Sequence, residues 1–423
     1  MWRNERRRTI ILNIIIFLVL ILVVVGLFKA MIYVNRQIDE EDKQLQAENS
    51  NQRQELIAAR QENQEAIQQT YESHLRVVSQ YLPGIVCWGD SLTAGSSGNV
   101  SYPATLQKYI NAYLCSTYDL RYSLENTENA SRLKKEDYKI SIPVVNMGAG
   151  QEDINTILGR SGVVPYVVDA DFSIPAGKQS VTVSITSQNG STVTPLTAGS
   201  GGVNPVTIAG VQGNLTLAQN QGVKTYQFTR LEEGDQVPVK KGTEVVTSCT
   251  NEYRDYIHVV WLGSYGEYFS PEKLVAQTKQ LLQRQQINTD RYLVIGPCTV
   301  RGEWYNAQRY TMDAIDTAML QAFGSHYVNL RKYLIEDGLR DANITATRED
   351  TMYINQGSVP NSFRSNAGGA DLNAVAYDLV GKLVYSRMES LGFFDEVIES
   401  LNLEETTQEL LKSDPQYFDR QLK

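Results

Sequence analysis

Residues 85–95 read Ile-Val-Cys-Trp-Gly-Asp-Ser-Leu-Thr-Ala-Gly, in which four apolar residues run directly into a Gly-Asp-Ser turn. A short apolar run bounded by a glycine has the length and composition of a buried strand. A serine at the carboxyl end of such a strand stands at the rim of an open α/β sheet, where these folds bind their ligands. Ser91 is therefore a candidate nucleophile, and the neighbouring backbone amides are candidate donors to an oxyanion.

The same strand pattern recurs four more times along the chain. The runs occupy residues 143–147, 258–262, 292–295 and 327–330, and stretches with the composition of helices lie between them, such as 103–114 and 272–286. Strands that alternate with helices predict a parallel sheet covered by helices on both faces.

Residues 163–248 interrupt this alternation. They are rich in Val, Thr, Gly and Ser and contain turn signals such as Gln-Asn-Gly at 188–190. Short runs such as 180–185 and 224–228 have the composition of strands. We predict a small all-β domain inserted into the α/β domain. Its role stays open between binding a carbohydrate or a partner and packing as a lid.

The amino terminus has the pattern of a membrane anchor. Arginines at position 3 and at positions 6–8 precede an apolar run, 10–28, that one Asn and one Gly interrupt. About twenty apolar residues span a bilayer as a helix, and this run is longer than a signal-peptide core and lacks a cleavage motif. We expect a retained single-pass helix, with the arginines cytoplasmic and the main domain outside the membrane.

The residues after the anchor are polar and predict a helical stalk that ends at Pro83-Gly84. Its heptad positions 38, 45, 52, 59 and 66 carry Ile, Leu, Gln, Ala and Ala. Such a seam makes either a weak coiled coil, and so a homo-oligomer, or a single solvated helix. The predicted divisions are an anchor (1–34), the stalk (35–80), the α/β domain (81–162 and 249–395), the β insertion (163–248) and an acidic, helical surface tail (396–423).

The overall composition excludes several classes of protein. Hydrophobic residues make up 42% and charged residues 21% of the 423, so the chain is not disordered throughout. A net charge of −9 argues against nucleic-acid binding. The four cysteines, Cys87, Cys115, Cys249 and Cys298, form no Cys-x-x-Cys pair, so we expect neither a zinc site nor another cofactor. Disulfides and buried free thiols both remain open for them.

The heptapeptide at 89–95, following an apolar strand, resembles block one of the SGNH (GDSL-type) hydrolases, a family of serine esterases and acylhydrolases. The resemblance covers most of residues 80–395 and implies a flavodoxin-like three-layer fold. It implies that Ser91 is the nucleophile and that Gly148, in Asn-Met-Gly, supplies an oxyanion amide beside that of Ser91. The run 148–162 is similar to family members that are membrane-anchored or secreted and carry a β insertion.

Two other blocks depart from the family pattern. Block three has Tyr265 where the family has an oxyanion asparagine, and a phenol can donate one hydrogen bond. Block five is Asp-x-x-His in the family. Aligned on the downstream Leu-Asn…Tyr, residues 365–377 put Asp371 at the histidine and Gly368, which has no side chain, at the aspartate. Aligned from Ser365, they put Asn366 at the aspartate with two residues inserted. Neither alignment contains a histidine.

The three histidines elsewhere in the chain are poor substitutes. His74 lies in the stalk. His258 begins its strand and His326 precedes its strand, so both lie at the end of the sheet away from the serine. A serine needs a positioned base with a pKa near the working pH. An aspartate such as Asp371 meets that requirement only if burial strongly raises its pKa.

Two hypotheses follow. The chain is a membrane-anchored, outward-facing esterase acting on acyl, for example O-acetyl, esters of glycans, with Ser91 as nucleophile and Asp371 as an unusual base. Alternatively, it is a catalytically impaired binding or scaffold protein of the cell envelope that keeps the same fold. The absent histidine favours the second hypothesis, because without an imidazole the serine hydroxyl is a weak nucleophile.

Overall fold

The computed structural model describes residues 2–96, 100–124, 132–198, 201–220, 223–264, 270–286, 290–298 and 306–422. These residues form two compact units, 1–70 and 71–423, which are described separately.

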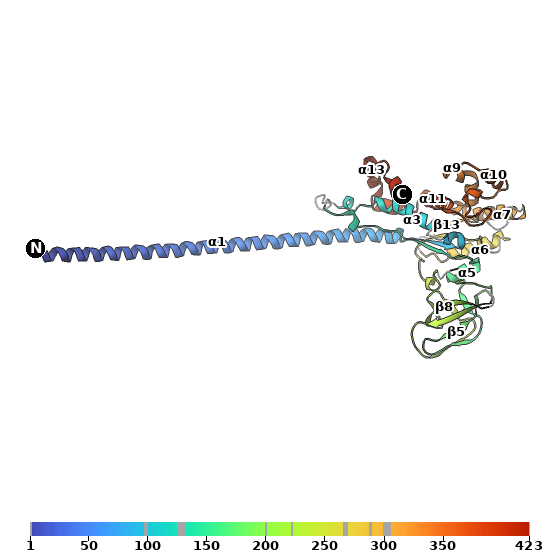
Figure 1. Ribbon diagram of the computed structural model, residues 1–423, viewed down its shortest axis with the longest axis horizontal. Coiled ribbons are helices and arrows are strands. Elements are labelled where there is room, and N and C mark those ends of the chain that lie inside the picture. The colour runs from blue at the N-terminus through green and yellow to red at the C-terminus, as the bar shows by residue number, and fades with distance from the viewer. Residues whose placement is uncertain are drawn as a thin grey trace. The chain divides into compact units, whose positions relative to one another are not determined.

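The first unit belongs to one continuous helix, α1 (Trp2–Tyr81), drawn in blue in Figure 1. The helix contains a window of mean hydropathy 3.4 that is fully exposed, and by length and composition it is a candidate membrane span. The predicted anchor and stalk are therefore parts of one helix. It ends at Tyr81, where the sequence predicts, because Pro83 cannot continue it.

The second unit is built on a five-stranded parallel sheet. Its strands are β1 (Ile85–Gly89), β2 (Val144–Gly148), β12 (Ile257–Trp261), β13 (Tyr292–Ile295) and β14 (Tyr327–Val328), in the order β14-β13-β12-β1-β2. This is the strand order of flavodoxin-like folds. Because β2 and β12 flank β1, the carboxyl end of β1 lies at the topological switch point, where such sheets bind ligands. The predicted α/β fold with a parallel sheet is confirmed.

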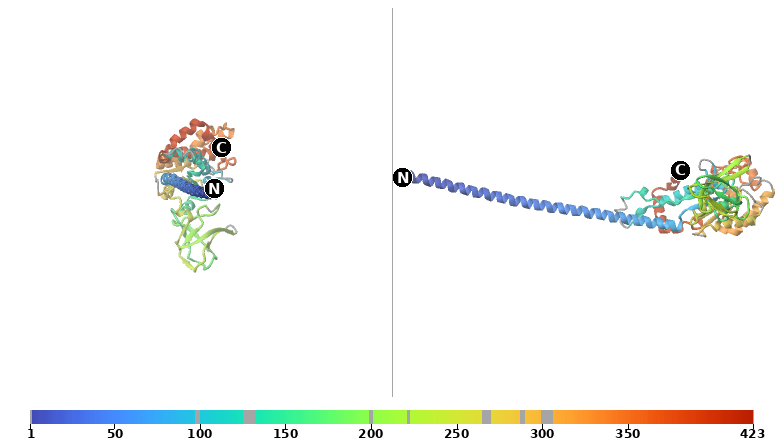
Figure 2. Two further views of the ribbon diagram at one scale, coloured as in Figure 1. Left: turned by 90° about the vertical axis from the view of Figure 1, so that its left-hand side faces the viewer. Right: turned by 90° about the horizontal axis from the view of Figure 1, so that it is seen from below.

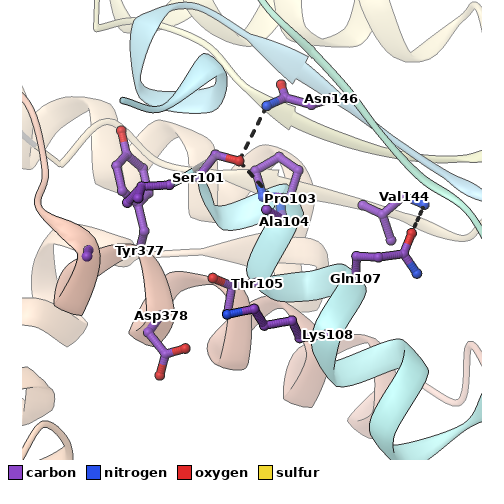
Figure 3. Close-up of a pocket in the computed structure, with 12 residues that line it drawn as sticks. Ser101, Pro103, Ala104, Thr105, Gln107, Lys108, Val144, Asn146, Tyr377 and Asp378 are labelled. Atoms are coloured by element: carbon purple, nitrogen blue, oxygen red, sulfur yellow. Dashed lines mark hydrogen bonds between the residues drawn. The ribbon is translucent and has the colours of Figure 1, made fainter. Parts of the chain in front are cut away.

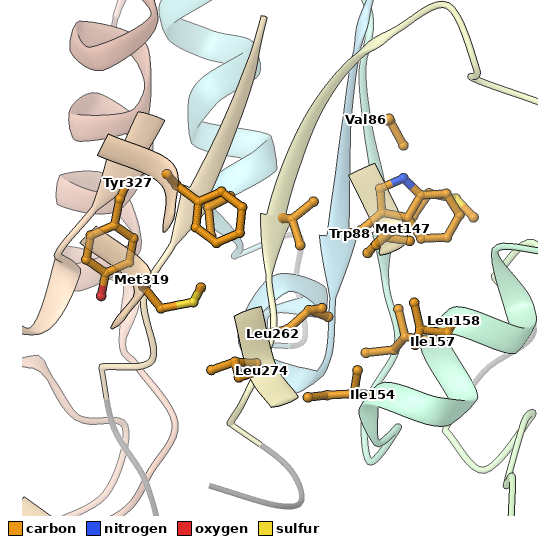
Figure 4. Close-up of a cluster of buried hydrophobic side chains, with 14 of the residues drawn as sticks. Val86, Trp88, Met147, Ile154, Ile157, Leu158, Leu262, Leu274, Met319 and Tyr327 are labelled. Atoms are coloured by element: carbon orange, nitrogen blue, oxygen red, sulfur yellow. The ribbon is translucent and has the colours of Figure 1, made fainter. Parts of the chain in front are cut away.

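Both faces of this sheet are buried. On one face, Val86 and Trp88 pack with side chains of α5 (Ile154–Arg160), α6 (Pro271–Leu282) and α7 (Asn306–Phe323), as Figure 4 shows. On the other, Trp261 meets Tyr102 of α3 (Tyr102–Tyr113) edge to face, with ring centroids 5.6 Å apart. Helix α3 in turn packs on α11 (Ala374–Ser390). Burial of successive strand residues on opposite faces explains why the strands read as continuous apolar runs.

The predicted β insertion is present as an antiparallel lobe beside the parallel sheet (Figures 1 and 2). A seven-stranded sheet of order β5-β9-β8-β7-β11-β3-β6 and a separate β10-β4 pair enclose a core of their own. The strands are β3 (Tyr166–Val168), β4 (Phe172–Ile174), β5 (Ser180–Val183), β6 (Ile185–Ser187), β7 (Val206–Ile208), β8 (Val211–Asn220), β9 (Val223–Arg230), β10 (Val237–Val239) and β11 (Glu244–Val246).

The carboxyl-terminal tail is helical, and a few of its apolar side chains are buried. It consists of the short helices α12 (Asp395–Ser400), α13 (Leu403–Ser413) and α14 (Tyr417–Gln421). Leu403 is buried, and the Phe418 ring lies 4.8 Å from that of Tyr113 in α3. The tail packs against the α/β domain because this contact removes its few apolar side chains, and the surface they cover, from water.

The four cysteines form no disulfide bond with one another. Cys87, Cys249 and Cys298 are buried, and Cys115 is half-buried. Burial raises the pKa of the Cys87 thiol to about 12, so this thiol is inert at neutral pH.

The glycine that ends β1 generates a stability prediction. A side-chain carbon at Gly89 would stand 2.5 Å from the Trp261 carbonyl oxygen, on the backbone of the neighbouring strand. We expect Gly89→Ala to lower the free energy of unfolding by about 1–3 kcal/mol, as overpacking does in other cores. Chemical denaturation of the full chain in detergent measures this. The control is Gly201→Ala, where the added methyl meets no atom of the described residues within 4 Å, and equal stability of the two variants contradicts the prediction.

Candidate functional site

Ser91 lies on a sharp turn between a strand and a helix. β1 ends at Gly89, and α2 (Ser91–Ala94) begins one residue after Asp90. The buried Asp90 carboxylate accepts a hydrogen bond from the Leu92 amide at 3.0 Å and so caps α2. The structure therefore places the half-buried Ser91 at the carboxyl edge of the central strand.

A backbone amide points at the Ser91 hydroxyl. The Gln151 N–H donates to Ser91 Oγ over 3.1 Å. Gln151 has a φ of 61°, a left-handed conformation that few residues other than glycine adopt. This conformation occurs in the loop after β2, which crosses in front of Ser91. The sequence analysis missed Gln151, because nothing in the residue type signals a left-handed backbone.

Gly148 lies where β2 meets α2. Its amide donates to Asn146 Oδ1 at 2.9 Å, so this donor is already paired within its own strand. A side-chain carbon at Gly148 would collide with the Ala94 backbone nitrogen in α2. The glycine is therefore required for the close approach of α2 to β2. The oxyanion role of the Gly148 amide stays a prediction, and the amide that contacts the Ser91 hydroxyl in this structure is that of Gln151.

The segment that matches block five forms a tight loop before α11. The Gly368 backbone has a φ of 68°, which explains a glycine there. The buried Arg364 guanidinium holds the loop by donating to the carbonyls of Val359 and Gly369. Asp371 is exposed, and so is Asn366. The burial that would make Asp371 a base is thus absent. Tyr265, the predicted block-three donor, lies outside the described residues.

The histidines are engaged elsewhere, as the sequence analysis expects. His258 is buried at the amino end of β12, with Nε2 3.1 Å from the Tyr253 carbonyl oxygen, and burial lowers its pKa to about 3. His326 Nδ1 lies 2.9 Å from the Tyr292 carbonyl oxygen, and His74 Nδ1 lies 3.0 Å from the Tyr118 hydroxyl. In the part of the chain that the structure describes, no histidine hydrogen-bonds to Ser91.

A cavity of about 640 Å³ lies beside the site, along the edge strand β2 (Figure 3). Asn146 lies between this cavity and the helix that begins at Ser91. Its side chain accepts a hydrogen bond from the Gly148 amide and donates one to the Ala94 carbonyl oxygen at 3.3 Å. The other lining groups come from α3 and the first turns of α11, among them Gln107, Lys108, Tyr377 and Asp378. Ser91 does not line this cavity. Across the described ranges, no cluster of three or more His, Cys, Asp or Glu residues could hold a metal ion.

Comparisons with known proteins give only distant likenesses. No family model matches the chain, and no curated protein matches its sequence. Among solved structures it is similar to one titled "Peptidoglycan O-acetylesterase in action, 5 min", with 9% identity, a TM-score of 0.28, and coverage of 76% of this chain and 95% of that one. It is also similar to pyruvate kinase from Cryptosporidium parvum, with 9% identity, a TM-score of 0.16, and coverage of 80% and 76%. TM-scores this low do not establish a shared fold.

The buried His258 predicts a loss of stability in acid. Its pKa of about 3 in the folded state lies below the value of about 6.5 in an unfolded chain. Between these values only the unfolded chain takes up the proton, so the free energy of unfolding falls by about 1.4 kcal/mol for each pH unit as the pH drops from about 6.5 towards 3. The His258→Gln variant keeps a donor for Tyr253 and removes the titration. Denaturation curves between pH 7 and pH 4 should show a smaller pH dependence for this variant; an identical dependence means that His258 has the same pKa in the folded and the unfolded chain, and contradicts the prediction.

Proposed function

We propose that this chain is a membrane-anchored, SGNH-hydrolase-like protein whose Ser91 site binds the acyl ester of a cell-envelope ligand, such as an O-acetylated glycan, with little or no turnover. The hydrogen bonding of Ser91 carries the proposal. A backbone amide faces the hydroxyl, and no described histidine accepts its proton.

The arrangement suits the binding of an acyl carbonyl. A serine hydroxyl that accepts from the Gln151 amide still has its own proton to donate. That proton is available to the carbonyl oxygen of an ester that enters at the rim. A neutral hydrogen bond of this kind contributes about 0.5–1.5 kcal/mol, which is enough to favour an acylated ligand over its deacylated form.

The same arrangement argues against efficient hydrolysis. Attack by a serine requires a base that removes its proton. His258 is buried at the opposite end of its strand, and Asp371 is exposed. Serine hydrolases that lose a triad member retain roughly 10³–10⁴-fold acceleration over water, which comes from binding and the oxyanion hole. Turnover at or below that residual level is expected here.

A second candidate function is a slow esterase. The position of Ser91 favours it, since the hydroxyl stands at the switch point of the sheet, where such folds bind their ligands. In this alternative Asp371 acts as the base, and its exposed carboxylate has to become buried when the substrate covers it.

The membrane part of the proposal rests on the first unit of the chain. The apolar window of α1 is long enough to span a bilayer, and four arginines precede it. The arginines would stay in the cytoplasm and residues 71–423 would lie outside. The exposed heptad positions Ile38 and Leu45 would allow the stalks of two copies to pair.

The catalytic question is tested with p-nitrophenyl acetate and a fluorophosphonate probe on the full chain in detergent. We expect the wild type to hydrolyse the ester no faster than Ser91→Ala and to remain unlabelled by the probe, because no histidine in the described part of the chain hydrogen-bonds to the serine. Asp371→His restores an imidazole at the block-five position, and activity that appears only in this variant supports the proposal. Hydrolysis or labelling of the wild type that depends on Ser91 would establish the esterase instead.

The ligand-binding part of the proposal is tested by titration calorimetry. The affinity for acetylated xylo-oligosaccharides is compared with the affinity for the same oligosaccharides after alkaline deacetylation. We expect tighter binding of the acetylated form. Ser91→Ala should reduce that preference roughly two- to tenfold, which corresponds to the loss of one neutral hydrogen bond. Equal affinity of Ser91→Ala and wild type for the acetylated form argues against this site.

The orientation of the chain is tested by protease digestion of spheroplasts from a bacterial host. We expect external protease to remove residues 71–423, whereas a tag placed before Met1 stays protected because the arginines hold the amino terminus inside. Replacing the four arginines by glutamine should scramble the orientation while the chain still resists carbonate extraction. Protection of the main domain in intact spheroplasts contradicts the proposed topology.

A further inference from the structure

A segment of the β insertion reaches the loop that faces Ser91. A side-chain carbon added to Gly150 would lie 3.1 Å from the Ala198 methyl carbon and 3.8 Å from Ser91 Oγ. Ala198 and Ser91 therefore flank the same small space in front of Gly150, one from the insertion and the other from the α/β domain. Ala198 itself is exposed.

The segment is fastened at its first end. The Thr194 amide donates to Thr156 Oγ1 of α5 at 3.0 Å, and the Tyr226 hydroxyl donates to the Pro195 carbonyl at 3.0 Å. Pro195 is buried. The chain thus leaves the insertion's core at a fixed point only three residues before Ala198.

The segment is also fastened beyond Ala198, by Arg160 at the last turn of α5. Arg160 Nη1 donates to the Gly201 carbonyl at 3.2 Å, and Nε donates to Glu152 at 2.8 Å. Both members of this ion pair are buried. Glu152 directly follows Gln151, whose amide contacts Ser91. One guanidinium therefore holds both the insertion segment and the loop that carries the amide donor.

From these contacts we infer that the β insertion supplies the specificity-determining wall of the Ser91 site, and that Ala198 limits the acyl group admitted there to a short one, such as acetyl. Thr156 and Arg160 are positioning residues that hold this wall. The inference rests on the proposed function, in which an acyl ester enters beside Ser91, and adds to it the size class of the acyl group.

The test uses a thiol in place of the serine, so that it needs neither catalysis nor an identified ligand. The full chain carries Ser91→Cys together with Cys115→Ser, since the other three cysteines are buried. Two reagents are compared: iodoacetamide, whose acyl part has the size of acetyl, and the bulky iodoacetamidofluorescein. For each reagent, the rate of alkylation of the protein is divided by its rate of alkylation of glutathione. We expect iodoacetamide to react readily and the bulky reagent to be slower by at least about tenfold, or about 1.4 kcal/mol in activation free energy.

Variants of Ala198 and Thr156 show whether the insertion, rather than the surroundings of residue 91 alone, limits the alkylation rate. Ala198→Trp should slow both reagents, and Ala198→Gly and Thr156→Val should speed only the bulky one. Lys178→Trp, in the exposed turn between β4 and β5, is the matched control and should change neither rate. Near-ultraviolet circular dichroism verifies that each variant is folded.

The outcomes distinguish the two proposals. Rates that Ala198→Trp leaves unchanged in a folded, iodoacetamide-reactive protein overturn the wall and leave the proposed function standing. An introduced thiol that even iodoacetamide cannot reach overturns both, because the site is then closed to any acyl group.

Discussion

The buried ion pair between Arg160 and Glu152 is the interaction on which the organisation of the second unit depends. The guanidinium donates to Glu152, to the Met147 carbonyl at the end of β2 and to the Gly201 carbonyl in the insertion. It also lies 5.4 Å from the centre of the Trp88 ring in the core. Burial raises the pKa of Glu152, and the attraction of Arg160 opposes that shift. A buried charge without such partners would destabilise the fold by several kcal/mol.

A second buried arginine stabilises the point where the chain returns from the insertion. Arg284 lies 5.1 Å from the centre of the same Trp88 ring and donates to the carbonyls of Ser161, Cys249 and Thr250. Burial lowers the pKa of Arg284 to about 10, so it remains a cation at neutral pH. Entry into the insertion and exit from it are thus joined through two cations that both lie close to the Trp88 ring. The insertion is therefore connected to the Ser91 loop by buried polar contacts, which have strict geometric requirements.

The chemistry of the site follows from which groups this framework brings to the serine. It aims the Gln151 amide at the Ser91 hydroxyl, and it leaves the imidazole of His258 buried and neutral at the amino end of β12. A backbone amide donates a hydrogen bond to an oxygen atom, but it cannot accept the proton of the serine hydroxyl. Binding and proton transfer are separate requirements: the described residues place an amide donor at Ser91, and no described histidine hydrogen-bonds to its hydroxyl.

Much of the fold could be predicted from the sequence, because local signals determine the strands, the insertion and the end of the first helix. Continuous apolar runs ending in glycine specify buried parallel strands, the Val- and Thr-rich stretch specifies the β insertion, and Pro83 ends α1, all through short-range sterics and burial. The pairing of donors could not be read in the same way. Whether Gly148 or Gln151 faces the serine depends on a left-handed backbone and on Asn146 capturing one amide. The approach of Ala198 to Gly150 likewise joins residues far apart in the chain. Such contacts arise only when separate elements pack together, since no local propensity encodes where two distant backbones meet.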